Sequence, residues 1–424
     1  MGGGESVIPP LSMIDQPMST ALSGIRVLDL SRILAGPTAT QLLADLGAEV
    51  IKIEKPGSGD DTRGWGPPFL KNAEGRETRE SAYYLSSNRG KHSVAIDIAT
   101  PQGQSVIRRM AETSDVLVEN FKFGDLDRYG LGYDDLRKLN PKLIYCSISG
   151  FGRTGPNKHR AGYDFLIQGE GGLMSLTGEA APLKAGVGVA DVVCGLYATI
   201  GILAAIEARH KTGNGQFIDI ALMDAQVALL VNQGVAYLTD GQVPPRRGND
   251  HPTIVPYGVF PASDGDFILA IGNDQQFQKF TALAGAPELA INPHYAKNAD
   301  RVRHRTSLVP VLRQLTIKRA ASQWISVLDT AGVPAGPINS LDRVFASEQV
   351  SARQMRIRMP HEKAGSGFVE LIGNPLKFSD TPVCYQKQPP RLGEDTDQVL
   401  KTVFNFSDQD IETLRTQGIL GNEQ

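Results

Sequence analysis

The sequence predicts an α/β protein built on a doubly wound, parallel sheet. The prediction begins with three elements that follow one another within about thirty residues. An apolar run at 25–30 is followed by a helix that begins near Pro37 and ends before Gly47, and a second apolar run follows at 49–54. Proline early in a helix and glycine just past its end are typical helix boundaries. A strand, a helix and a strand in so short a space form a βαβ unit, whose strands pair in parallel.

The same alternation continues along the chain. Later strands are expected at 93–98, 115–121, 143–151 and 217–222, and helices at 101–113, 133–140 and 224–238. Doubly wound sheets bind ligands at the carboxyl ends of their strands. In this chain those ends are Ser31 to Gly36, Glu54 to Gly59, Asn120 to Gly124 and Gly150 to Gly155.

One further helix is expected after Asp191, because the fifteen residues from Val192 to Ile206 carry no charge. This apolar helix is expected to be shorter than the ~20 residues of a membrane span, and so to be a core helix. Asp191 itself has two interpretations. Aspartate is a favoured N-cap, and a carboxylate among small residues is also a good nucleophile for a large substrate. We also expect the helix dipole to keep this carboxylate ionised.

The chain is long enough for more than one domain. We expect a flexible leader at 1–20, the N-terminal part of a large domain at 21–225, a linker and small domain at 226–333, and a return to the large domain at 334–424. The small domain is predicted from a hairpin-like stretch near 257–272 and helices near 275–284 and 306–330. The stretches 239–259 and 331–340 are expected to be loops.

Composition excludes several function classes. A net charge of −3, with 41% apolar residues, gives no reason to expect nucleic acid or membrane partners. Three widely spaced cysteines predict neither disulfides nor a zinc site, and a cytoplasmic location is the default. The seven histidines lack metal-ligand spacing, and no dinucleotide fingerprint, P-loop or G-x-S-x-G motif is present.

Several stretches of the chain together resemble one known family. They are GIRVLDLSRILAGP (24–37), LGAEVIKIEKPGSGD (46–60), VENFKFG (118–124), YGLGYDDL (129–136), ISGFGRTGP (148–156), GLMSLTG (172–178) and KTGNGQ (211–216). In this order and spacing they resemble the family III CoA-transferases, a family that also includes acyl-CoA racemases. The resemblance runs from about residue 22 to the C-terminus.

The resemblance implies a Rossmann-like large domain made from both chain ends, a small inserted α+β domain, and an interlocked, ring-like homodimer. It implies acyl-CoA and a small carboxylic acid as substrates, with no tightly bound cofactor and no metal. It also implies that Asp191 is the nucleophile, which passes through an acyl–aspartyl anhydride and an aspartyl-CoA thioester. This function needs water to be excluded from the anhydride.

The resemblance further implies a CoA site. Its residues would be Ile33, Leu34 and Ala35 along the adenine and pantetheine path, Lys55 and Arg128 at the phosphates, Ile96 beside the adenine, and Asn120 and Phe121 in the turn after a strand. Cations at two of these positions suit a ligand that carries several phosphate charges.

Tyr163 bears on the choice of reaction, because racemases of the family resemble A-G-H-D where this chain has A-G-Y-D. Without the histidine one of the two bases needed for racemisation is missing, so we expect a transferase. Residues 59–69 and 272–277 look most like succinyl-CoA-dependent dicarboxylate transferases. An oxalate-type CoA-transferase, an α-methylacyl-CoA racemase and a non-catalytic CoA-binding protein are the alternatives. Candidates for holding the far carboxylate of the acceptor are Arg63, Arg89, Arg246 and Arg247.

Overall fold

The computed structural model describes residues 20–421, which form two compact units. The first unit contains the chain up to Gly172, Ala185–Val235 and the chain from Ser351 onward, and the second contains Leu173–Lys184 and Ala236–Val350. Compared with the predicted insertion at 226–333, the second unit begins and ends later, and it includes a separate short segment. Most of the predicted leader lies outside the described residues.

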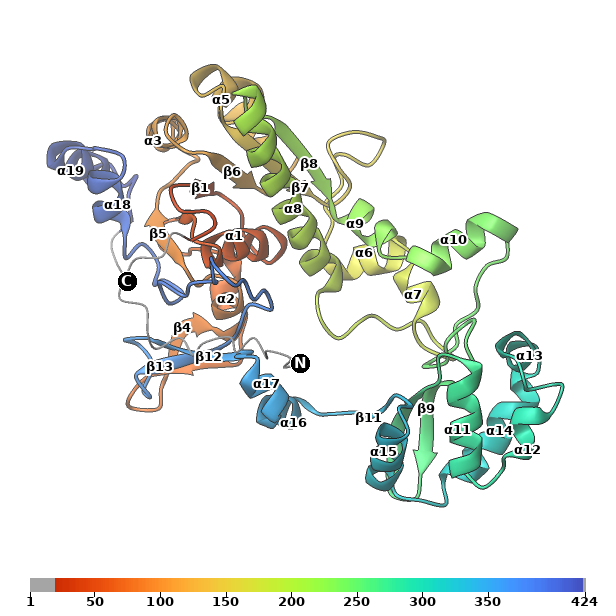
Figure 1. The fold of residues 1–424 in the computed structure, drawn as a ribbon. Coiled ribbons are helices and arrows are strands. Elements are labelled where there is room, and N and C mark those ends of the chain that lie inside the picture. The colour runs from red at the N-terminus through yellow and green to blue at the C-terminus, as the bar shows by residue number, and fades with distance from the viewer. Residues whose placement is uncertain (1–19, 422–424) are drawn as a thin grey trace, which may run out of the picture. The chain divides into compact units, whose positions relative to one another are not determined.

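A six-stranded parallel sheet forms the centre of the first unit, as predicted (Figure 1). Its strands are β1 (Arg26–Asp29), β2 (Glu49–Glu54), β5 (Lys91–Ala95), β6 (Val116–Glu119), β7 (Ile144–Ser149) and β8 (Phe217–Ala221). Their order is β5-β2-β1-β6-β7-β8. The chain therefore runs outward from β1 in one direction and then from β6 in the other, as in doubly wound folds. The topological switch point lies between β1 and β6, where such folds bind their ligands.

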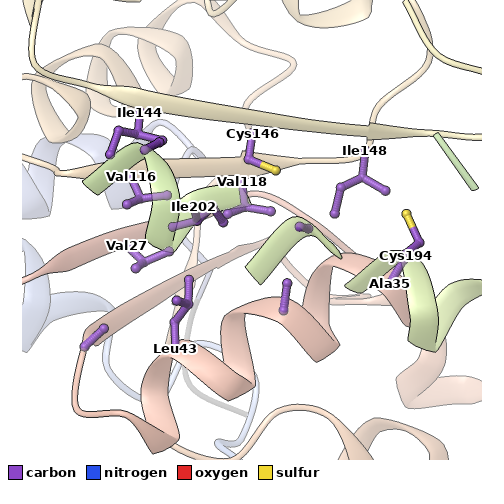
Figure 2. Packing of buried hydrophobic residues seen from close by; sticks show 14 of the residues in the cluster. Val27, Ala35, Leu43, Val116, Val118, Ile144, Cys146, Ile148, Cys194 and Ile202 are labelled. Carbon is purple, nitrogen blue, oxygen red and sulfur yellow. The ribbon is translucent and has the colours of Figure 1, made fainter. Parts of the chain in front are cut away.

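Helices cover both faces of this sheet, which is why its strands are apolar on both sides. On one face lie α1 (Ala35–Asp45) and α8 (Val189–Thr212), and on the other lie α3 (Pro101–Ala111), α5 (Tyr133–Leu139), α18 (Thr396–Thr402) and α19 (Asp408–Thr416). Figure 2 shows the first of these cores, in which Val118 and Cys146 of neighbouring strands lie close to Ile202 of α8.

The helix that carries Asp191 is a central part of this core. Gly195 allows α8 to approach α1 closely, since a Cβ atom there would lie 2.7 Å from the carbonyl oxygen of Ala35. The expectation that this helix is shorter than a membrane span is wrong, because α8 has 24 residues. Among the described residues it is the one helix whose length and composition would allow it to cross a membrane. It packs on α1, β7 and β8.

The C-terminal segment contributes to the first unit. It forms the strand pair β12 (Arg356–Pro360) and β13 (Phe368–Ile372), and then α18 and α19. Asp395, just before α18, accepts a hydrogen bond from the backbone N–H of Ser93 in β5 at 2.9 Å. The remaining elements of this unit are a 3-10 helix at Asp61–Gly64, β3 (Phe69–Lys71), β4 (Glu77–Ser81), α2 (Ala82–Ser86), α4 (Asp125–Arg128), α6 (Asp164–Glu170) and α9 (Leu222–Ala228).

The second unit contains a three-stranded antiparallel sheet with order β11-β10-β9. The predicted hairpin is present as β9 (Tyr257–Ala262) and β10 (Gly265–Ala270). Part of the predicted loop at 331–340 is instead β11 (Ala335–Pro337), which pairs with β10. The helices here are α7 (Leu173–Leu176), α11 (Asp274–Leu283), α12 (Glu288–Ile291), α13 (Asn298–Arg303), α14 (Arg305–Thr316), α15 (Ala321–Thr330), α16 (Leu341–Ala346) and α17 (Glu348–Ala352).

Two of the predicted helices are each divided in the structure. The helix expected at 224–238 is α9 followed by α10 (Val231–Asp240), and the chain turns at Val231, whose φ is +34°. A β-branched residue at positive φ is outside helical geometry, so a continuous helix there is excluded. The helix expected at 306–330 is divided into α14 and α15 by residues 317–320.

Candidate active site

Asp191 lines a cavity of about 250 Å³ at the carboxyl ends of β1, β6 and β7. This is the switch point of the sheet, where a doubly wound fold is expected to bind its ligand. The structure brings seven of the predicted site residues together around this cavity: Ile33, Leu34, Ala35, Asn120, Phe121, Tyr163 and Asp191. They come from four separate parts of the chain, so their proximity is a product of the fold.

A second cavity, of about 400 Å³, lies beside the first. Its lining includes the predicted site residues Lys55, Ile96 and Phe121. Both cavities are lined by Arg32, Asp61 and Phe121, so the two form a continuous surface. Such a surface suits an elongated ligand with a reactive group at one end.

The predicted phosphate-binding cations differ in their surroundings. Lys55 is exposed at the second cavity and makes no ion pair with any other described residue. Arg128 is 70% exposed and is paired with Asp125 at 2.5 Å, and it lines neither cavity. Lys55 therefore lines the second cavity, whereas Arg128 lines neither cavity.

Asn120 binds the neighbouring loop through both ends of its amide. Its Oδ1 accepts from the N–H of Arg32 at 3.0 Å, and its Nδ2 donates to the carbonyl oxygen of Arg32 at 2.6 Å. This two-point contact joins the loop after β1 to the loop after β6 across the switch point. The side chain of Asn120 therefore shapes the wall of the cavity through the backbone of Arg32.

Ile33 has a strained backbone in the wall of the cavity. Its φ is +73°, in the left-handed region that β-branched residues rarely adopt. Holding a non-glycine residue there costs about 1–3 kcal/mol, and such residues concentrate at functional sites. The strain gives a reason, independent of any family, to regard this loop as part of a binding site.

The start of α8 answers the question of whether Asp191 is a helix cap. The helix begins at Val189, Gly188 is its N-cap, and Asp191 is the third helical residue. The N–H of Ala190 in the first turn of α8 donates to the carboxylate of Asp164, and not to Asp191, at 2.9 Å. The second oxygen of Asp164 accepts from the amide of Gln168 at 2.7 Å. The N-cap interpretation of Asp191 is therefore wrong, and a carboxylate from α6 binds the first turn.

The carboxyl group of Asp191 is difficult to ionise. Burial and then the nearby charge of Asp164 raise its pKa from 3.8 to about 7. The expectation that the helix dipole keeps Asp191 ionised is thus wrong in its outcome, because desolvation and a like charge outweigh it. A poorly solvated carboxylate is a stronger nucleophile than one in water. Such a group can attack an electrophilic carbonyl carbon placed in the cavity.

Tyr163 occupies the loop that faces Asp191 across this cavity and is 64% exposed. Its position depends on a contact between two glycines, because a Cβ atom on Gly162 would lie 2.6 Å from the Cα of Gly150. The loop is held against the end of β7 by backbone contact, and no side chain stands between them. This geometry requires glycine at both positions.

Four cations that line the cavity with Asp191 were not among the site residues predicted from the sequence. They are Arg32, Lys122, Lys158 and Arg160. Arg32 is paired with Asp61 at 2.8 Å and Arg160 with Glu170 at 2.6 Å. A run of basic residues at 158–160, just before the A-G-Y-D motif, was the available signal. These charges favour an anionic ligand.

The predicted candidates for holding a distal carboxylate are not among the residues that line either cavity. Arg63 is buried among Glu54, Glu80 and Tyr84, and Arg89 is buried in a pair with Asp45. Arg246 donates to the backbone carbonyls of residues 179 and 180, and Arg247 is exposed in the second unit. In the part of the chain that the structure describes, no cluster of three or more potential metal ligands occurs.

The fold and the site define a class of protein. It is a doubly wound α/β enzyme with an elongated, cation-lined surface that ends at a half-buried carboxylate. Comparison with known proteins gives the family. Residues 22–396 match the model of CoA-transferase family III, and the chain belongs to that family.

Named relatives and a solved structure agree with this assignment. A succinate–glutarate CoA-transferase from Agrobacterium fabrum is 47% identical over 92% of this chain and 97% of its own length. A succinyl-CoA:glutarate CoA-transferase from Homo sapiens is 40% identical over 100% of this chain and 95% of its own length. The crystal structure of a CaiB/BaiF family protein from Brucella suis has a TM-score of 0.79 and 46% identity, covering 90% of this chain and 98% of that chain.

Proposed function

We propose that this enzyme moves CoA from succinyl-CoA to a dicarboxylic acid of about the size of glutarate, with Asp191 as the nucleophile. The observation that carries the proposal is the half-buried, poorly solvated carboxylate of Asp191 at one end of an elongated, cation-lined surface. The relatives named above as succinate–glutarate and succinyl-CoA:glutarate transferases supply the substrate class.

The reaction begins when an Asp191 oxygen attacks the thioester carbonyl of succinyl-CoA. The C–S bond breaks, CoA leaves as a thiolate, and a succinyl–aspartyl anhydride forms. The thiolate then attacks the Asp191 carbonyl carbon, which releases succinate and leaves an aspartyl-CoA thioester. The acceptor carboxylate attacks that thioester, which again releases the thiolate and forms a second anhydride between Asp191 and the acceptor. The thiolate then attacks the acceptor's acyl carbon in this anhydride and forms the new acyl-CoA. Asp191 is regenerated as a carboxylate, so the energy of the thioester is kept throughout.

Each predicted site residue has a role that fits its position. Ile33, Leu34 and Ala35 form the wall beside the pantetheine and thioester, and Ile96 and Phe121 lie along the adenine end. Lys55 pairs with phosphate charge, and Arg128 contributes at longer range from beside the surface. Asn120 fixes the wall, as its hydrogen bonds to Arg32 indicate. Tyr163 closes the thioester end, where a racemase would need an imidazole.

The homodimer and the cytoplasmic location belong to the same proposal, as does the large domain built from both chain ends. Support for the dimer comes from large apolar side chains exposed on three mutually contacting helices, α6, α8 and α9. They are Phe165, Leu166, Leu196, Tyr197, Ile200 and Val227, each more than 40% exposed. An extended apolar surface of this kind is typical of an obligate interface. Sedimentation equilibrium of the purified chain tests it, and a monomer at micromolar concentration would contradict it.

The transferase is tested by incubating the protein with succinyl-CoA and a panel of mono- and dicarboxylic acids. Mass spectrometry of the new CoA esters identifies the acceptor, and five-carbon dicarboxylates are expected to react best. Hydroxylamine should trap the aspartyl-CoA thioester on the peptide that contains Asp191. The matched control is Asp135→Asn, which removes an exposed carboxylate from α5 and should leave the activity unchanged. Transfer by an Asp191→Ala variant would exclude this mechanism.

A further inference from the structure

The loop that follows β1 is held by side chains at almost every polar backbone atom. The N–H of Ser31 donates to Asp29 at 2.9 Å, and its carbonyl oxygen accepts from the ammonium group of Lys52 at 2.8 Å. Both backbone groups of Arg32 bind the amide of Asn120. The N–H of Ile33 donates to both oxygens of Asp60, at 3.2 and 3.3 Å. Loops of this kind normally bond to water or to their own backbone.

The group that holds Ile33 is itself fixed by a fully buried ion pair. Asp60 and Lys52 approach to 2.9 Å, and neither side chain is exposed. Thr62 adds two hydrogen bonds to the same carboxylate oxygen of Asp60, from its N–H at 3.0 Å and its hydroxyl at 2.7 Å. Burial opposes the charge of Asp60, yet the Lys52 ammonium and the Thr62 bonds outweigh it and lower its pKa to about 2. Asp60 is therefore a rigid, permanently charged acceptor beneath the loop.

The conformation that these contacts impose is the strained one. Ile33 has a φ of +73° and lines the cavity that contains Asp191, while Asp60, Lys52 and Ser31 line the adjoining cavity. A loop free to relax would return Ile33 to negative φ and change the shape of the wall between the two cavities. Since binding to a preformed wall avoids the ordering cost, a fixed loop favours the ligand.

We infer that the Lys52–Asp60 pair is a positioning device for acyl-CoA, which holds Ile33 at positive φ so that the wall is formed before the ligand arrives. The inference rests on the proposed function for the identity of the ligand. Lys52 and Asp60 act through the loop, and neither is a catalytic residue.

The test measures the dissociation constant of CoA by titration calorimetry, together with kcat and KM for succinyl-CoA. Asp60→Asn keeps the size of the side chain and removes the charge that Lys52 and Ile33 bind. We expect it to weaken CoA binding by roughly 5- to 150-fold, the factor that corresponds to loss of the strain-holding contact. KM should rise by a similar factor, with a smaller change in kcat.

A rescue experiment separates positioning from general damage. Glycine adopts positive φ without strain, so in an Ile33→Gly background the Asp60→Asn substitution should weaken CoA binding by less than about threefold. The matched control is Asp45→Asn, which removes a carboxylate from the equally buried pair with Arg89, away from this loop. It should lower the melting temperature and leave CoA affinity unchanged.

The outcomes can be told apart. Equal weakening by Asp60→Asn in the wild-type and Ile33→Gly backgrounds, or unchanged CoA affinity in Asp60→Asn, would overturn the inference. If Asp60→Asn does not fold, Thr62→Val removes one hydrogen bond from Asp60 at constant volume and should weaken CoA binding in the same direction by a smaller factor. CoA binding is measured without turnover, so failure of the proposed transferase would appear separately, as the absence of new CoA esters with the wild-type enzyme.

Discussion

Two carboxylates, the buried Asp60 and the half-buried Asp191, line adjoining cavities and have opposite properties. Asp60 faces the ammonium group of Lys52, and its pKa is lowered to about 2. Asp191 faces the carboxylate of Asp164, and its pKa is raised to about 7. Burial raises the pKa of both groups. In Asp60 the Lys52 ammonium and the Thr62 hydrogen bonds outweigh it, whereas in Asp191 burial is the larger cause and the charge of Asp164 adds to it.

The largest effect is expected from removing the reactive member. Asp191→Asn should reduce kcat by at least ~10³-fold, because an amide cannot form the anhydride. The same variant should melt at a higher temperature than the wild type at pH 8. The pKa of Asp191 is about 7 in the folded protein, against 3.8 for an ordinary aspartate. Ionising Asp191 therefore reduces the stability of the wild type as pH rises from about 4 to about 7, by roughly 4 kcal/mol at most. Melting curves of both proteins at pH 5 and pH 8 test this, and a variant that melts below the wild type at pH 8 would contradict it.

Removing the cation that pairs with Asp60 should leave its buried carboxylate difficult to ionise, as that of Asp191 is. Lys52→Met leaves a buried carboxylate without its partner and should lower the free energy of unfolding by about 3–5 kcal/mol. Urea denaturation at pH 7 provides the measurement. Lys138→Met, which breaks the exposed pair with Asp135, is the control and should cost less than ~1 kcal/mol. Similar losses in the two variants would show that burial of the Lys52 pair has no special importance.

Neutralising the charge of Asp164 should move the titration of Asp191. The acid limb of the kcat/KM profile is expected near pH 7, with activity rising as Asp191 loses its proton. Asp164→Asn keeps an oxygen for the N–H of Ala190 and removes the repulsion, so the limb should move to lower pH. The other charged or titratable groups near Asp191 are Tyr83, Cys194, Asp61, Arg32, Lys122, Lys158, His159 and Arg160. An unchanged profile would show that the burial of Asp191, and not the charge of Asp164, sets its pKa.

The smallest effects are expected at two exposed cations, Lys55 and Arg128. They differ in that Arg128 has an ion-pair partner and Lys55 has none among the described residues. Lys55 makes no ion pair with another described residue and lines the ligand surface, so Lys55→Ala should weaken CoA binding by roughly tenfold. Arg128 already has Asp125 as its partner and lines neither cavity, so Arg128→Ala should change the affinity by less than about threefold. Calorimetry at two salt concentrations measures both, and the reverse order would contradict the structure-based ranking.

The large sheet could be predicted from sequence because its signals are local. Apolar runs bounded by glycine, and Pro37 and Gly47 at the ends of the first helix, depend on neighbouring residues alone. The predictions that failed depended on single torsions or on distant partners. Nothing in the composition of 224–238 indicates the positive φ of Val231 that divides α9 from α10, and β11 forms only because β10 offers a free edge.

The candidate site likewise divides into residues that local sequence signals predict and contacts that depend on distant partners. Residues next to strand ends, such as Ile33 and Asn120, were predicted to line it, and the structure places them there. The role of Asp164 was missed, since its contact with Ala190 joins positions 26 residues apart in the chain. The raised pKa of Asp191 was missed for the same reason, because it depends on burial and on that distant carboxylate.

The contact between Gly150 and Gly162 has a consequence for how chemistry can change on this scaffold. Because backbone atoms alone hold the loop to the sheet, the mostly exposed side chain at position 163 has little packing to preserve. A tyrosine there can be exchanged for an imidazole by one substitution without rebuilding the core. Position 163 is thus a place where a different functional group can be presented to the cavity while the fold and Asp191 stay as they are.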